Sequence, residues 1–241
     1  MNHEVLIPRP NLLRRWFALQ YLKVILPFYR RRVGRPGMAT PDGLALATMP
    51  GVFHPVYMRA GVMLGRAAAQ FEPRQGQDRA LDMGCGSGIV GLYMARNGYQ
   101  TTCVDINPRA IRLTRANAIL NDLEAHVEVR QGDVFEPVKS QKFDLICFSP
   151  PYFKGQPDED DGLSLAFWSD GLMARFARAL PDYLTAQGVA LVHLSTDGDS
   201  DGFLRPAIAS GLNVSVHSRK DFGNEIMTVY AVRLKKGETE V

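Results

Sequence analysis

The sequence is poor in cysteine, with only three in 241 residues. Cys85, Cys103 and Cys147 are widely spaced and form no C-x-x-C pair, which argues against a disulfide framework and against a zinc site. Free cysteines of this kind favour a reducing, cytoplasmic environment. The histidines and acidic residues form no pattern typical of a metal site either, so we expect no metal.

Long apolar runs, repeats and low-complexity tracts are also missing. The stretch Trp16–Phe28 is interrupted by Gln20 and Lys23 and is shorter than the roughly 20 residues that span a bilayer. No small-residue cleavage site follows it, so we expect neither a transmembrane segment nor a secretory signal. A hydrophobic share of 46% and a charged share of 22% exclude a disordered or fibrous chain. The net charge of +3 is too small to indicate a partner.

The excess positive charge of the chain lies in the first 35 residues. They carry eight basic residues and one acid, Glu4. Apolar residues between Asn11 and Leu26 would cover most of a helix surface, and Asn11 suits its N-cap. A stretch rich in glycine and proline follows from 33 to 51. We therefore expect residues 1–50 to form a helical cap and linker, and residues 51–241 to form the main domain.

This basic helix allows three interpretations. It could be an arm that binds nucleic acid, a helix lying on a membrane surface, or a lid that buries its apolar face over a cleft. We favour the lid, which would also exclude water from the cleft.

From residue 51 the pattern alternates between short apolar runs and helical segments. Strands are predicted near 79–83, 101–106, 126–131, 143–149 and 188–195, and helices near 57–70, 88–97, 108–121 and 167–184. This alternation predicts a parallel sheet in an α/β fold. The last two strands, near 212–220 and 225–235, are joined by a short turn and predict an antiparallel hairpin at the end of the sheet.

Three glycines, Gly84, Gly86 and Gly88, alternate between a predicted strand and a predicted helix. Without side chains they allow a tight turn and let the backbone approach a ligand, although such a turn also occurs without one. The next strand ends in Asp105, where a carboxylate can accept both hydroxyls of a ribose or can cap the following helix. Asp133 ends the third strand, where it could read an adenine amino group. Together these strand ends predict a nucleoside cleft.

The motifs around these residues resemble those of class I S-adenosylmethionine-dependent methyltransferases over residues 51–235. The resemblance implies a Rossmann-like sheet of seven strands with an antiparallel last strand, and S-adenosylmethionine as the co-substrate. It implies a cofactor-binding set of Asp82, Gly84, Cys85, Gly86, Gly88, Asp105, Ile106, Asp133, Val134 and Ser149.

The tetrad Ser149-Pro150-Pro151-Tyr152 resembles the signature of enzymes that methylate a planar, weakly basic nitrogen of adenine, cytosine or a glutamine side chain. Such a nitrogen has a delocalised lone pair, so its hydrogens must be held by acceptors while an aromatic face supports its plane. The catalytic candidates are therefore Ser149, Pro150 and Tyr152, since the prolines fix the backbone and the tyrosine supplies the face. The candidates for binding substrate are Phe167, Trp168, His54 and Tyr57.

Within this group the sequence is most similar to release-factor glutamine methyltransferases. The shared motifs are Phe53-His54-Pro55, Asp105-Ile106-Asn107-Pro108 and Ser218-Arg219. That family has asparagine at the position of Ser149, and a hydroxyl cannot offer the paired donor and acceptor of an amide. Four consecutive acids, 158–161, argue against a nucleic-acid substrate because nucleic-acid affinity rests on basic contacts.

The leading hypothesis from the sequence is an S-adenosylmethionine-dependent N-methyltransferase that acts on a small molecule or an amide-like nitrogen. The expected partner is a small-molecule substrate rather than nucleic acid. One alternative is a cyclase that closes the methionine part of S-adenosylmethionine to azetidine-2-carboxylate and releases methylthioadenosine. Another is a methyltransferase for protein glutamine or RNA. His193, in a buried strand, is expected to be a core residue rather than a base.

Overall fold

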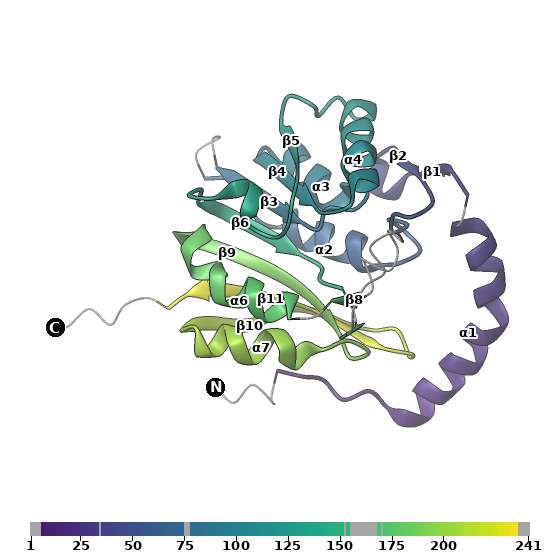
Figure 1. The fold of residues 1–241 in the computed structure, drawn as a ribbon. Helices are drawn as coiled ribbons and strands as arrows, with labels where there is room; N and C mark the ends of the chain where they lie inside the picture. The colour runs from purple at the N-terminus through teal and green to yellow at the C-terminus, as the bar shows by residue number, and fades with distance from the viewer. Residues whose placement is uncertain are drawn as a thin grey trace.

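The computed structural model describes residues 6–33, 35–74, 78–151, 153–154, 168–169 and 171–235, and for 22, 24–33, 153–154 and 168–169 it describes the backbone alone. A seven-stranded sheet forms its centre, in the order β10-β11-β9-β6-β3-β4-β5 (Figure 1). The strands are β3 (Arg79–Met83), β4 (Gln100–Asp105), β5 (Val127–Gln131), β6 (Phe143–Phe148), β9 (Leu184–Ser195), β10 (Leu212–Asp221) and β11 (Ile226–Leu234).

The strand directions confirm the predicted sheet. Strands β5, β4, β3, β6 and β9 pair in parallel, whereas β11 runs antiparallel to both of its neighbours, β9 and β10. All five parallel strands therefore have their carboxyl ends at one edge of the sheet, where ligands bind in open α/β folds.

Helices cover both faces of the sheet. They are α2 (Ala60–Ala68), α3 (Ile89–Arg96), α4 (Pro108–Leu120), α6 (Leu172–Tyr183) and α7 (Ser200–Ala209). Alternate residues of a strand point to opposite faces. Thus Leu81 of β3 is buried with α6 and α7, while Ala80 is buried with α2 and α3.

Two helices differ from the sequence prediction. Helix α6 begins at Leu172 rather than near 167, after Gly171 with φ 68°. Helix α7 was not predicted, because Gly202 and Pro206 weaken its helical pattern. Its N-cap is Asp199, whose side chain accepts a hydrogen bond from the Gly202 N–H.

Residues 37–48 form a short two-stranded ribbon that packs on the main domain. It consists of β1 (Gly37–Ala39), the 3-10 turn η2 (Pro41–Gly43) and β2 (Leu46–Thr48). Leu44 and Leu46 are buried in the same core as α2 and α3. The side chains of Asn117 on α4 and of Asn121, its C-cap, bond to the backbone of the ribbon. This part of the expected linker is therefore packed structure.

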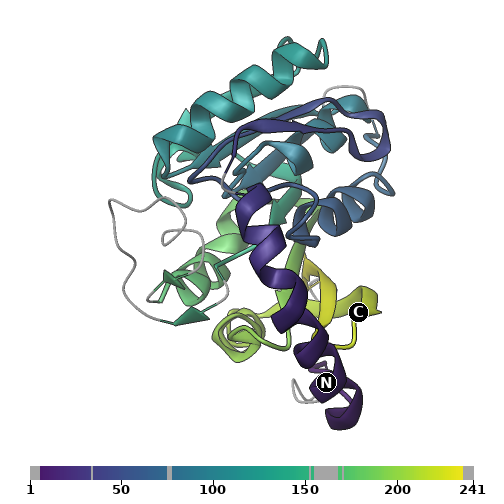
Figure 2. The same ribbon diagram turned by 90° about the vertical axis from the view of Figure 1, so that its right-hand side faces the viewer.

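Helix α1 (Leu12–Val33) lies along the side of the molecule where the parallel strands end (Figures 1 and 2). As predicted, Asn11 caps it by accepting hydrogen bonds from two backbone N–H groups of its first turn. Its inner face meets the domain through the ion pairs Arg14–Asp221 and Arg15–Asp197, 3.1 and 2.6 Å long. Its outer face presents the side chains Leu12, Leu13, Trp16, Phe17 and Tyr21, all more than half exposed. No helix in the described part of the chain is both long and apolar enough to cross a membrane.

Candidate active site

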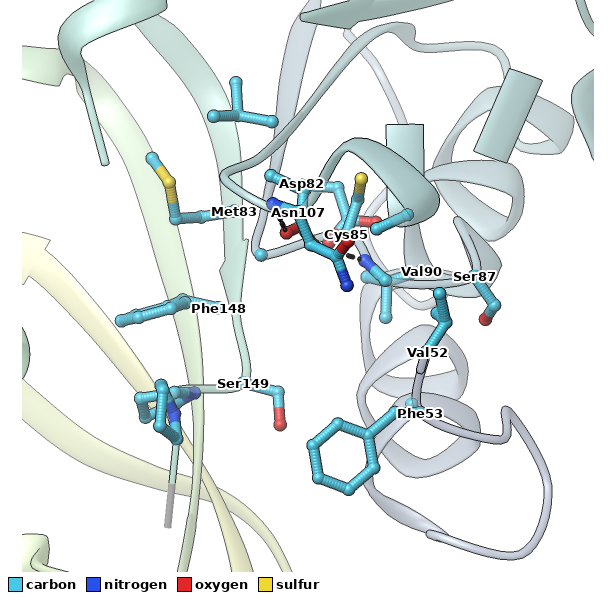
Figure 3. A pocket seen from close by; sticks show the side chains of 18 of the residues that line it. Val52, Phe53, Asp82, Met83, Cys85, Ser87, Val90, Asn107, Phe148 and Ser149 are labelled. Carbon is cyan, nitrogen blue, oxygen red and sulfur yellow. Dashed lines mark hydrogen bonds between the residues drawn. The ribbon is translucent and has the colours of Figure 1, made fainter. Parts of the chain in front are cut away.

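A pocket of about 180 Å³ opens where β3, β4 and β6 end (Figure 3). Five segments form most of its walls: the glycine turn after β3, the turn from β4 into α4, residues 52–61, the turn after β5 and the turn after β6. None of the described side chains of α1 lines it. The pocket therefore lies at the position predicted for the nucleoside cleft.

The glycine turn leaves its backbone open to the pocket. Gly84 and Gly86 have φ values of +67° and +54°, which favour glycine. A Cβ at Gly84 would lie 3.7 Å from the Phe148 ring, and one at Gly86 would lie 3.9 Å from Val52, so neither glycine is packed against the protein. The space above both is free for a ligand.

Gly88 has a different role from the other two glycines. It does not line the pocket, and a Cβ there would come within 2.8 Å of the Thr114 side chain. With φ +81° it occupies the N-cap of α3. Gly88 thus permits the close packing of α3 against α4.

Asp105 forms hydrogen bonds with both the glycine turn after β3 and the turn from β4 into α4. Its Oδ2 accepts a hydrogen bond from the Gly86 N–H and its Oδ1 accepts one from the Asn107 N–H, both at 2.8 Å. Burial raises the pKa of this carboxyl, while the backbone donors oppose that rise. Ile106, next to it, also lines the pocket and is half exposed. A partly buried carboxylate beside an exposed apolar residue suits a ribose followed by an adenine ring.

Asp82 and Cys85 form the floor of the pocket. Asp82 accepts a hydrogen bond from the Gly91 N–H at 2.8 Å, and burial raises its pKa to about 7. A hydrogen bond with Cys103, together with burial, raises the pKa of the Cys85 thiol well above its ordinary value. Cys85 therefore remains a protonated thiol at neutral pH. All three cysteines are free and buried.

Asp133 and Val134, the residues expected to contact adenine, line the pocket. However, both carboxylate oxygens of Asp133 accept hydrogen bonds from Arg175 of α6, at 2.8 and 3.1 Å. The carboxylate is thus engaged before any ligand binds.

Ser149, Pro150 and Pro151 form the opposite end of the pocket. Figure 3 shows the Ser149 hydroxyl and the Phe53 ring pointing toward one another across the opening. Tyr152, Phe167 and the acidic run 158–161 lie outside the described residues. For Trp168 the structure describes the backbone alone, in β8 (Trp168–Ser169), which pairs with β7 (Phe153–Lys154).

His54 lines the pocket, whereas Tyr57 does not. The His54 Nδ1 accepts hydrogen bonds from the N–H groups of Val56 and Tyr57, each at 3.3 Å, and burial lowers the pKa of the ring. The Tyr57 ring lies over His54 with 4.2 Å between centroids. His54 therefore shapes a turn at the edge of the pocket, and Tyr57 packs behind it.

Several lining residues were absent from the predicted set. Phe53 belongs to the Phe-x-Pro motif, which therefore offered a usable signal. Asn107 was visible in the Asp-Ile-Asn-Pro motif, and its Nδ2 donates to the Gly51 carbonyl at 2.9 Å. Val52 and Leu172 carry no sequence signal, because only the fold brings residues 52 and 172 to one pocket.

These observations fit S-adenosylmethionine. Asp105 would hold the ribose, Ile106 and Val134 would face adenine, and the open turn at Gly84 and Gly86 would face the methionine part. No group of three or more histidine, cysteine or acidic residues within the described residues could hold a metal ion.

Comparison with known proteins places the chain in a family. The sequence model of the methyltransferase small domain matches residues 44–170. The chain belongs to this family. It is an S-adenosylmethionine-dependent methyltransferase with the class I fold.

Two relatives have names that state their own substrate class. The first is a "putative protein N5-glutamine methyltransferase" of Methanocaldococcus jannaschii, 31% identical over 204 residues that cover 80% of this chain and 98% of the relative. The second is a release factor glutamine methyltransferase of Clostridium acetobutylicum, 26% identical over 71% of this chain and 65% of the relative. A solved 16S rRNA N2 G1207 methyltransferase of T. thermophilus, in complex with AdoMet and guanosine, shares the fold. Its TM-score is 0.64 at 18% identity, over 83% of this chain and 50% of that chain.

The predicted small-molecule partner is wrong, because these methyltransferase relatives are named for protein glutamine. That prediction rested on the serine at 149 in place of asparagine and on the acidic run 158–161. The alternative of S-adenosylmethionine cyclisation assumed a lid that seals the pocket, and the relatives give that alternative no support. None of the described side chains of α1 lines the pocket.

Proposed function

We propose that this protein methylates the side-chain amide nitrogen of a glutamine in a protein. The observation that carries the proposal is its similarity to the Methanocaldococcus jannaschii relative, which extends over 98% of that protein. The Ser149-Pro150-Pro151 turn at one end of the pocket supports it, because this turn can hold a planar nitrogen.

The chemistry requires alignment above all. An amide nitrogen shares its lone pair with the carbonyl, so it attacks only when its hydrogens are bound and its plane is held. The Ser149 Oγ and the Pro150 carbonyl would accept these two hydrogens, and the fixed φ of the prolines would keep the carbonyl in place. S-adenosylmethionine, when bound, supplies a methyl group activated by its sulfonium. Holding the amide in line with that methyl group provides the effective concentration that such reactions need.

Phe53 is the described aromatic residue that faces Ser149 across the pocket (Figure 3). Its ring can support the flat face of the glutamine amide. In this arrangement the oxygens of Ser149 and Pro150 would hold the edge of the amide, and the Phe53 ring would support its face.

A comparison of acceptors tests this proposal. The full chain is incubated with methyl-tritiated S-adenosylmethionine and one of three acceptors: a purified peptide chain release factor, the same factor with its methylated glutamine replaced by asparagine, or protein-free ribosomal RNA. We expect tritium in the first acceptor alone. Transfer to RNA, or equal transfer to both forms of the factor, would contradict the proposal.

A further inference from the structure

Ser149 has a buried polar neighbour, His193, which does not line the pocket. In the parallel pairing of β6 with β9, Phe148 lies opposite Val192, so the next pair along both strands is Ser149 and His193. The Ser149 Oγ and the His193 Nδ1 are 3.4 Å apart. Ser149 lines the pocket, whereas His193 lies behind it and is only 2% exposed.

The two side chains of this pair differ in the hydrogen bonds that they can donate and accept. Burial lowers the pKa of His193 to about 4, so the ring is neutral at neutral pH. A neutral imidazole has one donor and one acceptor nitrogen, while a hydroxyl donates one hydrogen and accepts up to two. In the antiparallel pairing of β9 with β11, His193 is paired with Val229.

A free serine hydroxyl would be a poor amide acceptor, because it could turn its own hydrogen toward the substrate. In the signature of the glutamine methyltransferases that the tetrad resembles, asparagine stands at this position, and its side-chain oxygen is always an acceptor. For serine to act in the same way, a neighbouring group must accept its hydroxyl hydrogen. The serine oxygen then faces the substrate only as an acceptor.

We propose that His193 is a positioning residue whose Nδ1 accepts the Ser149 hydroxyl hydrogen, so that the Ser149 oxygen faces the glutamine amide as an acceptor. This inference rests on the proposed function. It assigns the Ser149–His193 pair the task that asparagine performs alone. It also places the imidazole proton on Nε2.

A double-mutant cycle tests the pairing. His193→Leu removes the acceptor, whereas His193→Asn keeps an oxygen near the position of Nδ1. We expect His193→Leu to lower kcat for glutamine methylation about tenfold, the effect of one lost hydrogen bond, with an unchanged Kd for S-adenosylmethionine. His193→Asn should retain most of the activity. In a Ser149→Asn background, His193→Leu should have little effect, because the asparagine oxygen needs no partner to face the substrate.

Equal losses from His193→Leu in both backgrounds, or equal losses from the leucine and asparagine variants, would overturn the inference. A wild-type enzyme that methylates no glutamine would instead refute the proposed function, and the inference with it.

A spectroscopic measurement covers the case in which the leucine variant fails to fold. In nitrogen-15 NMR spectra of the wild-type chain, we expect an unprotonated Nδ1 and a protonated Nε2 for His193, with an Nδ1 shift that changes in Ser149→Ala. A protonated Nδ1, or an Nδ1 signal that Ser149→Ala leaves unchanged, would overturn the inference.

Discussion

Asp105 and Gly86 are joined across the mouth of the pocket by a 2.8 Å hydrogen bond from the Gly86 N–H to the Asp105 carboxylate. This bond holds the open glycine turn close to the end of β4. The same carboxylate also accepts a hydrogen bond from the Asn107 N–H, so one partly buried side chain organises both loops.

Replacing this carboxylate should weaken cofactor binding. An asparagine at 105 has one acceptor oxygen, so one backbone N–H loses its partner and the charge beside the ribose disappears. We expect Asp105→Asn to raise the Kd for S-adenosylmethionine at least about tenfold, as for a lost hydrogen bond to a charged group. Isothermal titration calorimetry measures this, with Glu124→Gln on the exposed surface as the matched control. An unchanged Kd in folded Asp105→Asn would count against the assignment of the ribose site.

A pair of glycine substitutions separates backbone strain from ligand space. Gly86 and Gly211 both have positive φ, +54° and +76°, and both have room for a Cβ, but only Gly86 lines the pocket. We expect Gly86→Ala and Gly211→Ala to lose similar stability, about 1 kcal/mol each, in chemical denaturation. Cofactor binding should be lost in Gly86→Ala alone. Normal binding by Gly86→Ala would show that the ligand does not approach this turn.

Asp133 should matter less than Asp105, although it follows β5 as Asp105 ends β4. Its two oxygens already accept from Arg175, and the two side chains are 40% and 56% exposed. We expect Asp133→Asn to change the cofactor Kd less than Asp105→Asn and to cost at most about 1 kcal/mol of stability. If titration finds the larger effect in Asp133→Asn, the adenine amino group must displace Arg175 from the carboxylate.

Burial of Asp82 makes the stability of the fold depend on pH. Its folded pKa of about 7 lies above the ordinary value of 3.8, so the folded state holds the proton more tightly than the unfolded chain. The free energy of unfolding should therefore fall as pH rises from 3.8 to about 7, by up to roughly 1.4 kcal/mol for each pH unit. Asp82→Asn can still accept from Gly91 but carries no charge. We expect it to be more stable than the wild type in urea above neutral pH, with no such difference at acidic pH; the reverse order would refute this account.

The sequence alone locates the parts of the site whose signals are local. Gly84 and Gly86 stand beside a predicted strand, and Asp105 ends the next one, so the order of the strands suffices to bring them together. The sequence cannot show that Gly88 packs on Thr114 or that Asp133 pairs with Arg175. These contacts join residues from different helices and strands, and only the packed fold brings them close.

The same limit applies to the acceptor end of the pocket. Ser149 was found from its motif, but its partner His193 follows from the strand register and was expected to be a core residue alone. The ribbon at 37–48 was interpreted as linker because glycine and proline dominate its sequence. It folds because Asn117 of α4 and Asn121, the C-cap of that helix, satisfy its backbone groups.

The most direct test of the central claim is tandem mass spectrometry of a release factor incubated with the full chain and S-adenosylmethionine carrying a deuterated methyl group. The account predicts the label on the side-chain nitrogen of one glutamine, with its loss in Ser149→Ala and its retention in Glu124→Gln. A label on another residue type would contradict the account. So would methylthioadenosine released without any acceptor, or an unmodified factor in the presence of enzyme that binds the cofactor.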